Sequence, residues 1–541
     1  MSDLFLGIDC STQSLTGLII NFHKKEVIYR EQIIYEKDLP QYKTKNGVIF
    51  FDNERVVHSY PLMWVDALNL LFNNLIQKEF AIYNIKAISG SGQQHGTVYL
   101  NRKFKSILSS LNPIELISEQ IREAFTRETS PIWMDSSTTE QCKQIREHLG
   151  GLKNTILLTG SNTFERFSGP QIRKFFQEDY EKYKHTDIIH LVSSFMASLL
   201  IGKNAPIDHG DGAGMNLMNI NSKSWDEKAL NATAPNLKDK LPSLVPSNKV
   251  IGNISNYFIE KYGFNSNTKI IAWSGDNQNS LIGVGLTEKG KVAISLGTSD
   301  TYFGYLKNLY LDLKGEGHVF GAPTGDYMSL ICYKNGSLAR ETIKEMYNLD
   351  WRTFSNILED TPPGNYGKIM LAYFHPEIVP SVLEPGIYRF GFDESDVNGN
   401  VRGIIESKFL SMKVHANWIE EKPNIILATG GASTNKEILQ VAANIFNSKI
   451  KKAQITDSAA LGAAFRSAKS YYDLKGEKKG WNEITNDFLK LQESEIIHPN
   501  EIYVDLYREM AALYKMYEDF ILNNGQDPEF SRQEFIKKYF S

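Results

Sequence analysis

The sequence contains little cysteine, little net charge and no long apolar run. Its 541 residues include three cysteines, Cys10, Cys142 and Cys332, which lie far apart and form no CxxC pair. Such sparse use argues against a disulfide framework and is typical of a reducing cytosol, so we expect a cytoplasmic protein. The net charge of −4 gives no general attraction to nucleic acid or anionic lipid, and we expect neither as a partner.

Membrane spans and several well-known catalytic motifs are also missing from the sequence. The longest apolar run, residues 188–202, has about 15 residues and contains His190, whereas a membrane span needs about 20. We therefore expect a core helix there. The N-terminus carries Asp3 and Asp9 and no basic region, so we do not expect a signal peptide. No His/Cys cluster has zinc spacing, and neither a GxSxG nor a Walker A motif occurs.

Strand-like and helix-like segments alternate along the whole chain. Hydrophobic residues make up 42% and charged residues 23%, which fits a globular protein with large cores. Four β-rich stretches end in small residues or glycine, at residues 85–92, 268–276, 290–298 and 424–431. This alternation predicts α/β layers with ligands at the carboxyl ends of strands. We expect two domains, residues 1–285 and 286–541, with a helical extension from about residue 475.

Two short turns of small and hydroxyl residues, nearly three hundred residues apart, have similar surroundings. Residues 8–14 read "IDCSTQS" and residues 294–300 read "ISLGTSD", and each turn lies between two apolar runs. Small residues let backbone N–H groups approach phosphate oxygens closely. The pair therefore indicates a duplicated domain that binds a polyphosphate. The alternative is two ordinary tight turns of similar composition.

Two aspartates follow strand-like stretches and are candidates for chemistry. Asp9 could hold a magnesium ion, directly or through water, or it could hydrogen-bond its own turn. Asp276 follows a strand and precedes a helix in "WSGDNQNSL". It could be a general base that accepts a hydroxyl proton during phosphate transfer, or a helix N-cap.

Two glycine-containing turns carry candidate binding groups. In "SGSGQQHG", His95 and the preceding glutamines suit a polyhydroxylated ligand, although a lone histidine is more often structural. In "TGGASTN", Gly430 and Gly431 would let the backbone approach a flat ligand such as adenosine, and Asn435 is placed to hydrogen-bond it. Glycine pairs are common at strand–helix turns, so this motif is weak by itself.

Taken in order, these segments resemble the FGGY family of carbohydrate kinases. The resemblance is carried by "GIDCSTQS", "ISGSGQQHGTVYL", "LTGSNTFERFSGPQIRKFF", "WSGDNQNSLIGVGL", "SLGTSDTYFG" and "ATGGASTNKEIL". It implies a duplicated ATPase fold of the actin–hexokinase, ribonuclease H-like type, with two α/β domains that flank a central cleft. Within the family the sequence is most like the eukaryotic branch that acts on D-xylulose. The implied reaction is ATP-dependent phosphorylation of D-xylulose to D-xylulose 5-phosphate, with Mg²⁺, by a monomer or homodimer.

The resemblance also implies roles for particular residues. Asp276 would be the catalytic base, and it would contact the sugar together with His95, Arg166 and Asn277. Asp9 would lie near magnesium, through water. The implied nucleotide-binding positions are Thr12, Thr298, Trp351, Gly430, Gly431 and Asn435. Another ketopentose or a polyol is the alternative substrate, and an actin-like nucleotide-binding protein without catalysis is the alternative of a different class.

Overall fold

The structure is a computed structural model that describes residues 3–453, 457–490 and 496–541. The chain forms two compact units. The first comprises the chain up to Thr287, the segment Val319–Met328 and the helices α18 (Ser458–Leu474) and α19 (Trp481–Lys490). The second comprises Glu288–His318 and the remaining elements. The boundary expected between residues 285 and 286 stays a prediction. Within the described residues, none of the helices combines the length and apolar character that crossing a bilayer requires.

A mixed seven-stranded sheet forms the centre of the first unit. Its order is β14-β15-β6-β1-β2-β3, and β16 also pairs with β6. The strands are β1 (Leu4–Cys10), β2 (Ser14–Asn21), β3 (Glu26–Ile34), β6 (Ile85–Gly92), β14 (Val250–Asn253), β15 (Lys269–Ile271) and β16 (Ser274–Gly275). Every residue of β1 and β2 is buried, which explains why both strands are mostly apolar along their whole length.

Three parallel strands of this sheet end at the same level. β1 and β6 are parallel with Cys10 opposite Gly92, and β16 runs parallel to β6 with Gly275 opposite the same Gly92. The residues that follow β1, β6 and β16 therefore emerge together, at what we call the carboxyl edge of the first unit. This is the position at which α/β sheets usually bind ligands.

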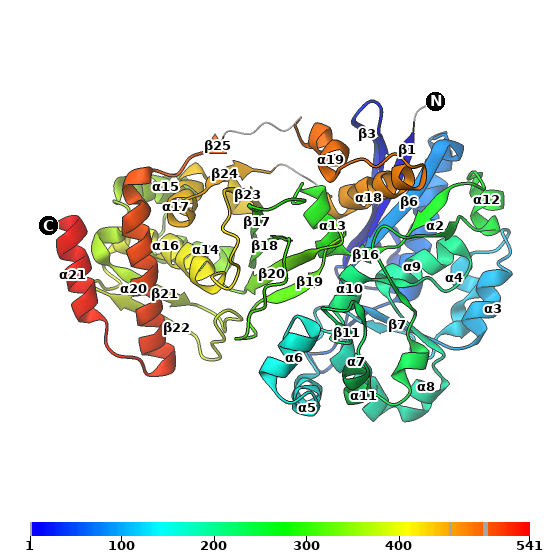
Figure 1. Cartoon of the computed structure of the whole chain (residues 1–541), viewed down its shortest axis with the longest axis horizontal. Coiled ribbons are helices and arrows are strands. Elements are labelled where there is room, and N and C mark those ends of the chain that lie inside the picture. The colour runs from blue at the N-terminus through cyan, green and yellow to red at the C-terminus, as the bar shows by residue number, and fades with distance from the viewer. Residues whose placement is uncertain (1–2, 454–456, 491–495) are drawn as a thin grey trace. The chain divides into compact units, whose positions relative to one another are not determined.

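Helix α18 packs on this sheet although it lies far along the chain (Figure 1). The approach is so close that a Cβ atom on Gly7 of β1 would overlap the carbonyl oxygen of Ala460. A Cβ on Gly462 would likewise overlap the carbonyl oxygen of Asn279 on α13 (Asp276–Gly283). Glycine at these positions lets α18 fix both β1 and α13, the two elements that lead to the carboxyl edge.

Helices and short strands complete the first unit. They include α2 (Pro61–Gln77), β7 (Thr97–Leu100), α5 (Thr139–His148), α6 (Leu152–Thr159), α7 (Ser168–Glu178), β9 (Ile188–Leu191), α9 (Val192–Ile201), β10 (Ile207–Asp208), α10 (His209–Ala213), β11 (Met218–Asn219), α11 (Glu227–Thr233), α12 (Asn256–Tyr262) and β13 (Leu244–Val245). The apolar run 188–202 was expected to be one core helix, but its first four residues form β9, which pairs with β7. The rest of the run, except Gly202 at its end, is the fully buried helix α9.

The second unit repeats the pattern of the first. The sheet around β17 has the order β19-β20-β18-β17-β23-β24-β25, with an antiparallel β17–β18 hairpin and β23 parallel to β17. Most of β19 and the start of β20 fall in the segment Val319–Met328, which groups with the first unit. These strands are β17 (Lys291–Leu296), β18 (Asp300–Leu306), β19 (His318–Gly321), β20 (Tyr327–Tyr333), β23 (Ile425–Thr429), β24 (Lys449–Lys452) and β25 (Ile496–Ile497). The arrangement of a hairpin beside a parallel strand matches β1, β2 and β6. The predicted duplicated α/β fold is thereby confirmed.

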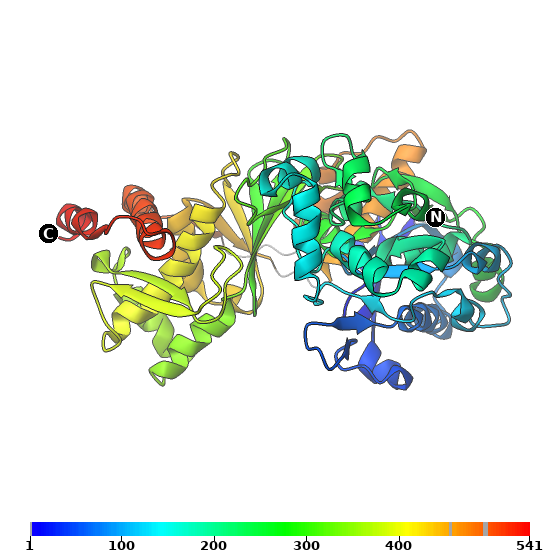
Figure 2. The ribbon, with the colours of Figure 1, turned by 90° about the horizontal axis from the view of Figure 1, so that it is seen from below.

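Six helices cover much of the second unit. They are α14 (Ser337–Met346), α15 (Trp351–Asp360), α16 (Val397–His415), α17 (Lys436–Phe446), α20 (Val504–Asn523) and α21 (Glu529–Phe540). The last two form the C-terminal part of the chain and are drawn in red (Figure 2). Helix α20 packs against α16 and α17.

Candidate active site

The end of β1 holds a buried carboxylate, Asp9, which is next to last in the strand. Asp9 is 8% exposed, and its Oδ1 accepts a hydrogen bond from Ser91 Oγ at 2.6 Å. Its other oxygen accepts from the Ser11 hydroxyl. Burial raises the pKa of Asp9, and the two hydroxyl donors oppose that rise. Asp9 therefore does hydrogen-bond within its own turn, and this leaves lone pairs free on both oxygens.

Asp276 stands at the carboxyl edge, at the end of β16. It is the first residue of α13, whose N-cap position belongs to Gly275, so the interpretation of Asp276 as the N-cap is wrong. Its Oδ1 accepts from the backbone N–H of Asn277 at 2.8 Å. The side chain is half-buried, and burial, reinforced by the charge of Asp9, raises its pKa to about 7. A carboxylate with such a pKa can accept a proton near neutral pH.

Two of the three other residues expected at the sugar, His95 and Arg166, lie beside each other. His95 is buried, with a backbone φ of 72°, and its Nδ1 lies 2.9 Å from the carbonyl oxygen of Gly214. Its ring centroid is 4.4 Å from that of Phe167. The Arg166 guanidinium lies 5.6 Å from the same ring. Burial, together with the charge of Arg166, lowers the pKa of His95 to about 3, so the imidazole is neutral.

Asn277 and Thr12 come shortly after Asp276 and Asp9 in the chain, at the same edge of the sheet. Asn277 Nδ2 donates to Gln94 Oε1 at 2.9 Å, which joins the ends of β16 and β6. Thr12 Oγ1 donates to Gln93 Oε1 at 3.2 Å and accepts from the indole N–H of Trp133 at 2.8 Å. Trp133 is 46% exposed, and the sequence analysis gave it no role.

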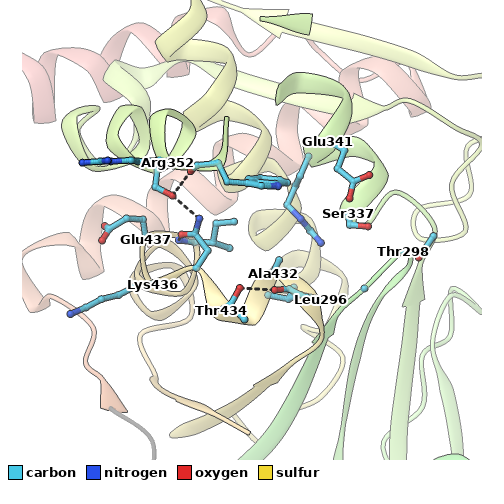
Figure 3. Close-up of a pocket in the computed structure, with 16 residues that line it drawn as sticks. Leu296, Thr298, Ser337, Glu341, Arg352, Ala432, Thr434, Lys436 and Glu437 are labelled. Carbon is cyan, nitrogen blue, oxygen red and sulfur yellow. Dashed lines mark hydrogen bonds between the residues drawn. The ribbon is translucent and has the colours of Figure 1, made fainter. Parts of the chain in front are cut away.

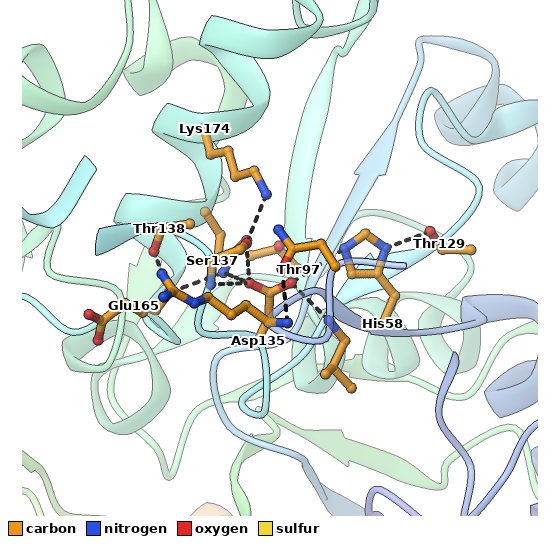
Figure 4. A network of polar contacts seen from close by, with 12 residues as sticks. His58, Thr97, Thr129, Asp135, Ser137, Thr138, Glu165 and Lys174 are labelled. Atoms are coloured by element: carbon orange, nitrogen blue, oxygen red, sulfur yellow. Dashed lines mark hydrogen bonds and ion pairs between the residues drawn. The ribbon is translucent and has the colours of Figure 1, made fainter. Parts of the chain in front are cut away.

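A buried network fixes the loop that carries Trp133 (Figure 4). At its centre is Asp135, which is 1% exposed. Its donors are the backbone N–H groups of Val57 and Ser137, the Ser137 hydroxyl and the Gln171 amide, at 2.6–3.1 Å. The same Gln171 amide and the Thr138 hydroxyl both donate to the carbonyl oxygen of Glu165, at 3.0 and 2.7 Å. The network therefore ties the Trp133 loop to the segment that carries Arg166.

Several buried polar atoms around the carboxyl edge have no hydrogen-bond partner within the described residues. They are Gln93 Nε2, Gln94 Nε2, Asp211 Oδ1, Ser274 Oγ and Gln278 Oε1. Buried polar groups are normally paired with protein or water. Hydroxyl groups of a ligand, or water, can supply hydrogen-bond partners for the outermost of these atoms.

A pocket in the second unit holds most of the expected nucleotide positions (Figure 3). Its volume is about 880 Å³, which suits a small-molecule ligand. Thr298 lies at one end, in the turn between β17 and β18, and Trp351, Gly431 and Asn435 also line the pocket. Thr12 belongs to the first unit and does not line it.

Of the expected glycine pair only Gly431 lines this pocket, and the two glycines have different structural reasons. Gly430 adopts a φ of 84°, and a Cβ there would lie 2.5 Å from the carbonyl oxygen of Leu296. A Cβ on Gly431 would meet nothing within 4 Å, so here the missing side chain leaves the pocket open. Asn435 caps α17 through the backbone N–H of Ile438 and donates to Ser355 Oγ at 2.7 Å.

Trp351 is the aromatic surface of this pocket. It begins α15 and is 42% exposed, so the indole offers aromatic surface to a flat ligand. Ser337 and Arg340 on α14 also line the pocket. The Arg340 guanidinium is held by both oxygens of Asp300, at 2.7 and 3.0 Å. The sequence analysis did not single out these α14 residues, because nothing local relates them to the turn at Thr298.

The residues around Asp9 fit a magnesium ion that is held through water. The described part of the chain has no cluster of three or more His, Cys, Asp or Glu side chains that could bind a metal directly. Magnesium in nucleotide sites usually keeps several waters and takes one or two carboxylates plus phosphate oxygens. A single carboxylate beside a hydroxyl-rich turn matches that donor set.

Comparison with known proteins identifies the family. The model of the FGGY family of carbohydrate kinases, N-terminal domain, matches residues 4–283, and that of the C-terminal domain matches residues 292–471. The chain therefore belongs to the FGGY family of carbohydrate kinases, as the sequence analysis predicted.

The curated relatives include several xylulose kinases. The chain is 44% identical over 489 residues to xylulose kinase 2 of Arabidopsis thaliana, covering 86% of this chain and 87% of that protein. It is 39% identical over 536 residues to xylulose kinase of Rattus norvegicus, covering 97% and 98%. Among solved structures, ligand-bound xylulose kinase from Lactobacillus acidophilus aligns with a TM-score of 0.78 at 20% identity, over 96% of this chain and 98% of that chain. At that identity the structural likeness shows the fold alone.

Proposed function

We propose that this chain is an ATP-dependent D-xylulose kinase that forms D-xylulose 5-phosphate. The observation that carries the proposal is the carboxyl edge, where Asp276, with a pKa near 7, stands among polar groups suited to sugar hydroxyls. The choice of sugar is supported by the 39–44% identity to xylulose kinases over most of the chain. We infer a cytoplasmic protein that acts as a monomer or homodimer on a sugar and ATP, without nucleic acid.

Asp276 is the general base of the proposed reaction. Its carboxylate accepts the proton of the terminal hydroxyl while that oxygen attacks the γ-phosphate of ATP. His95, neutral and aligned by the Gly214 carbonyl, binds sugar hydroxyls together with Arg166 and Asn277. The fixed Trp133 loop holds this set in place.

The second unit binds the nucleotide in the proposed reaction. Trp351 stacks on the adenine ring, the backbone at Gly430 and Gly431 lies along the adenosine, and Asn435 bonds its polar edge. Thr298 donates its hydroxyl to phosphate oxygens, and Thr12 does the same once its hydroxyl turns away from Gln93 Oε1. Asp9 would hold Mg²⁺ through water, and the metal would neutralise phosphate charge when bound.

An ADP-release assay coupled to a sugar panel tests the function. The panel contains D-xylulose, D-ribulose, L-ribulose, xylitol and glycerol, and the product is identified by phosphorus NMR. We expect the highest kcat/KM with D-xylulose and a phosphate on its terminal carbon. A higher kcat/KM with another member would overturn the sugar assignment. ADP release that no sugar accelerates would favour the actin-like alternative.

A further inference from the structure

Asp211 is a buried carboxyl group that the proposed chemistry does not use. It lies on α10 and is 1% exposed. Its Oδ2 accepts from Ser193 Oγ at 2.5 Å, and its backbone N–H donates to Asp208 Oδ1 at 2.8 Å. Its Oδ1 has no hydrogen-bond partner within the described part of the chain.

A second acceptor without a donor lies next to it. Gln278 Nε2 donates to the carbonyl oxygen of Gly210 at 3.1 Å, so Oε1 points away from that carbonyl. Among the described residues, Oε1 has no hydrogen-bond partner. A Cβ on Gly275 would overlap Gln278 Oε1 and lie 3.1 Å from Asp211 Oδ1, so both oxygens flank one backbone position. Two acceptor oxygens cannot bond each other unless one of them carries a proton.

The surrounding charges favour a proton on the carboxyl group. The groups that face Asp211, or share its helix, are Asp208 on β10, His209 on α10, Asp276 on α13 and Arg466 on α18. The described residues of β11, β13 and β16 contribute no charge, and α9 contributes the Ser193 hydroxyl. Arg466 is directed elsewhere, to Asn279 Oδ1 at 2.9 Å and to two backbone carbonyls. Burial raises the pKa of Asp211 well above its usual range; the Ser193 hydroxyl and the more distant charge of Arg466 oppose the rise, and the carboxylates of Asp208 and Asp276 add to it.

We propose that Asp211 stays protonated at neutral pH and donates from Oδ1 to Gln278 Oε1, as a positioning residue for Asp276. The hydrogen bond joins α10 to the first turn of α13, two residues beyond Asp276. A neutral Asp211 also adds no second negative charge beside Asp276, which burial and Asp9 already bring to a pKa of about 7. An ionised neighbour would raise that value further and reduce the basic form at neutral pH. The kinetic part of this proposal rests on the proposed role of Asp276.

Infrared spectroscopy of the whole unliganded protein tests the proton directly. Because Asp276 itself titrates near neutrality, the comparison is between Asp276→Asn and the double variant Asp276→Asn, Asp211→Asn at pH 7. We expect a protonated-carboxyl band that the second substitution removes. If the difference spectrum shows instead the loss of an ionised carboxylate, the proposal is wrong. This arm needs no substrate, so it stands or falls separately from the proposed function.

Kinetics test the positioning role. Asp211→Leu removes the donor, and we expect kcat with D-xylulose to fall about tenfold with the KM for ATP unchanged. Asp211→Asn offers an N–H in place of the O–H and should restore kcat to within about twofold, with the acid limb of the pH profile unmoved. An acid limb moved to lower pH in Asp211→Asn would mean that Asp211 was ionised. If Asp211→Leu does not fold, Gln278→Leu removes the same hydrogen bond, and unchanged kcat there overturns the role.

Discussion

Replacing Asp276 by Asn separates catalysis from structure at one position. The amide keeps the size of the side chain and an oxygen that can accept the Asn277 N–H, but it loses charge and basicity. We expect kcat with D-xylulose to fall by about 10²–10⁴-fold, the range that general-base catalysis contributes. Sugar affinity, measured by calorimetry, should change little, because the hydrogen-bonding groups remain.

The same substitution has a pH-dependent effect on stability. The pKa of Asp276 rises from 3.8 to about 7 on folding, so the folded protein binds this proton more tightly than the unfolded chain does. The ionised form therefore destabilises the fold above pH 7, by at most about 4 kcal/mol and less because the side chain is half-exposed. Asp276→Asn should melt at a higher temperature than the wild type at pH 8. The difference should vanish below about pH 4, where both states of the wild type are protonated.

The assay is steady-state ADP release beside calorimetric titration with D-xylulose and thermal melts at pH 4 and pH 8. Asp226→Asn is a matched control, because Asp226 starts α11 in the same unit and caps it through two backbone N–H groups. Asn caps a helix equally well, so this control should keep kcat and its melting temperature. A near-normal kcat for Asp276→Asn would refute the base assignment. Loss of sugar binding with a lower melting temperature would point to a structural role.

Four further predictions concern the pH profile and single substitutions in the two units. The wild-type kcat/KM should fall about tenfold per pH unit below pH 7 and level off above it, as measured over pH 5–9, because Asp276 must be ionised to accept a proton. His95→Ala should raise the KM for D-xylulose while slow ATP hydrolysis persists. Trp351→Ala should raise the KM for ATP about tenfold and leave the KM for the sugar unchanged. An unaltered KM for D-xylulose in the first variant, or for ATP in the second, would mean that the corresponding site is misplaced. Gly462→Val should lower the free energy of unfolding by about 3 kcal/mol or more in urea titrations, since its side chain meets the α13 backbone, whereas Gly480→Ala, which meets only a carboxylate at 3.5 Å, should not.

The sequence by itself determined the local pattern of this protein. Apolar runs that end in small residues predict strands that end in turns, and the two hydroxyl turns correspond to the β1–β2 and β17–β18 hairpins. Parallel strands bring their carboxyl ends to one edge, so Asp9, His95 and Asp276 could be expected together. These features depend on residues close together in the chain, which a sequence pattern records.

Only the tertiary structure decided which distant groups meet. The pairing of Trp133 with Thr12, the Asp135 network and the approach of Gln278 to Asp211 join segments that no periodicity relates. The local pattern of Asp276 also fitted an N-cap, and the backbone gave that position to Gly275. The placement of α18 on β1 depends on Gly7 and its placement on α13 depends on Gly462, and in the sequence these glycines look like ordinary flexible positions. Burial and neighbouring charges raise the pKa values of Asp211 and Asp276, and both causes depend on how the whole unit packs.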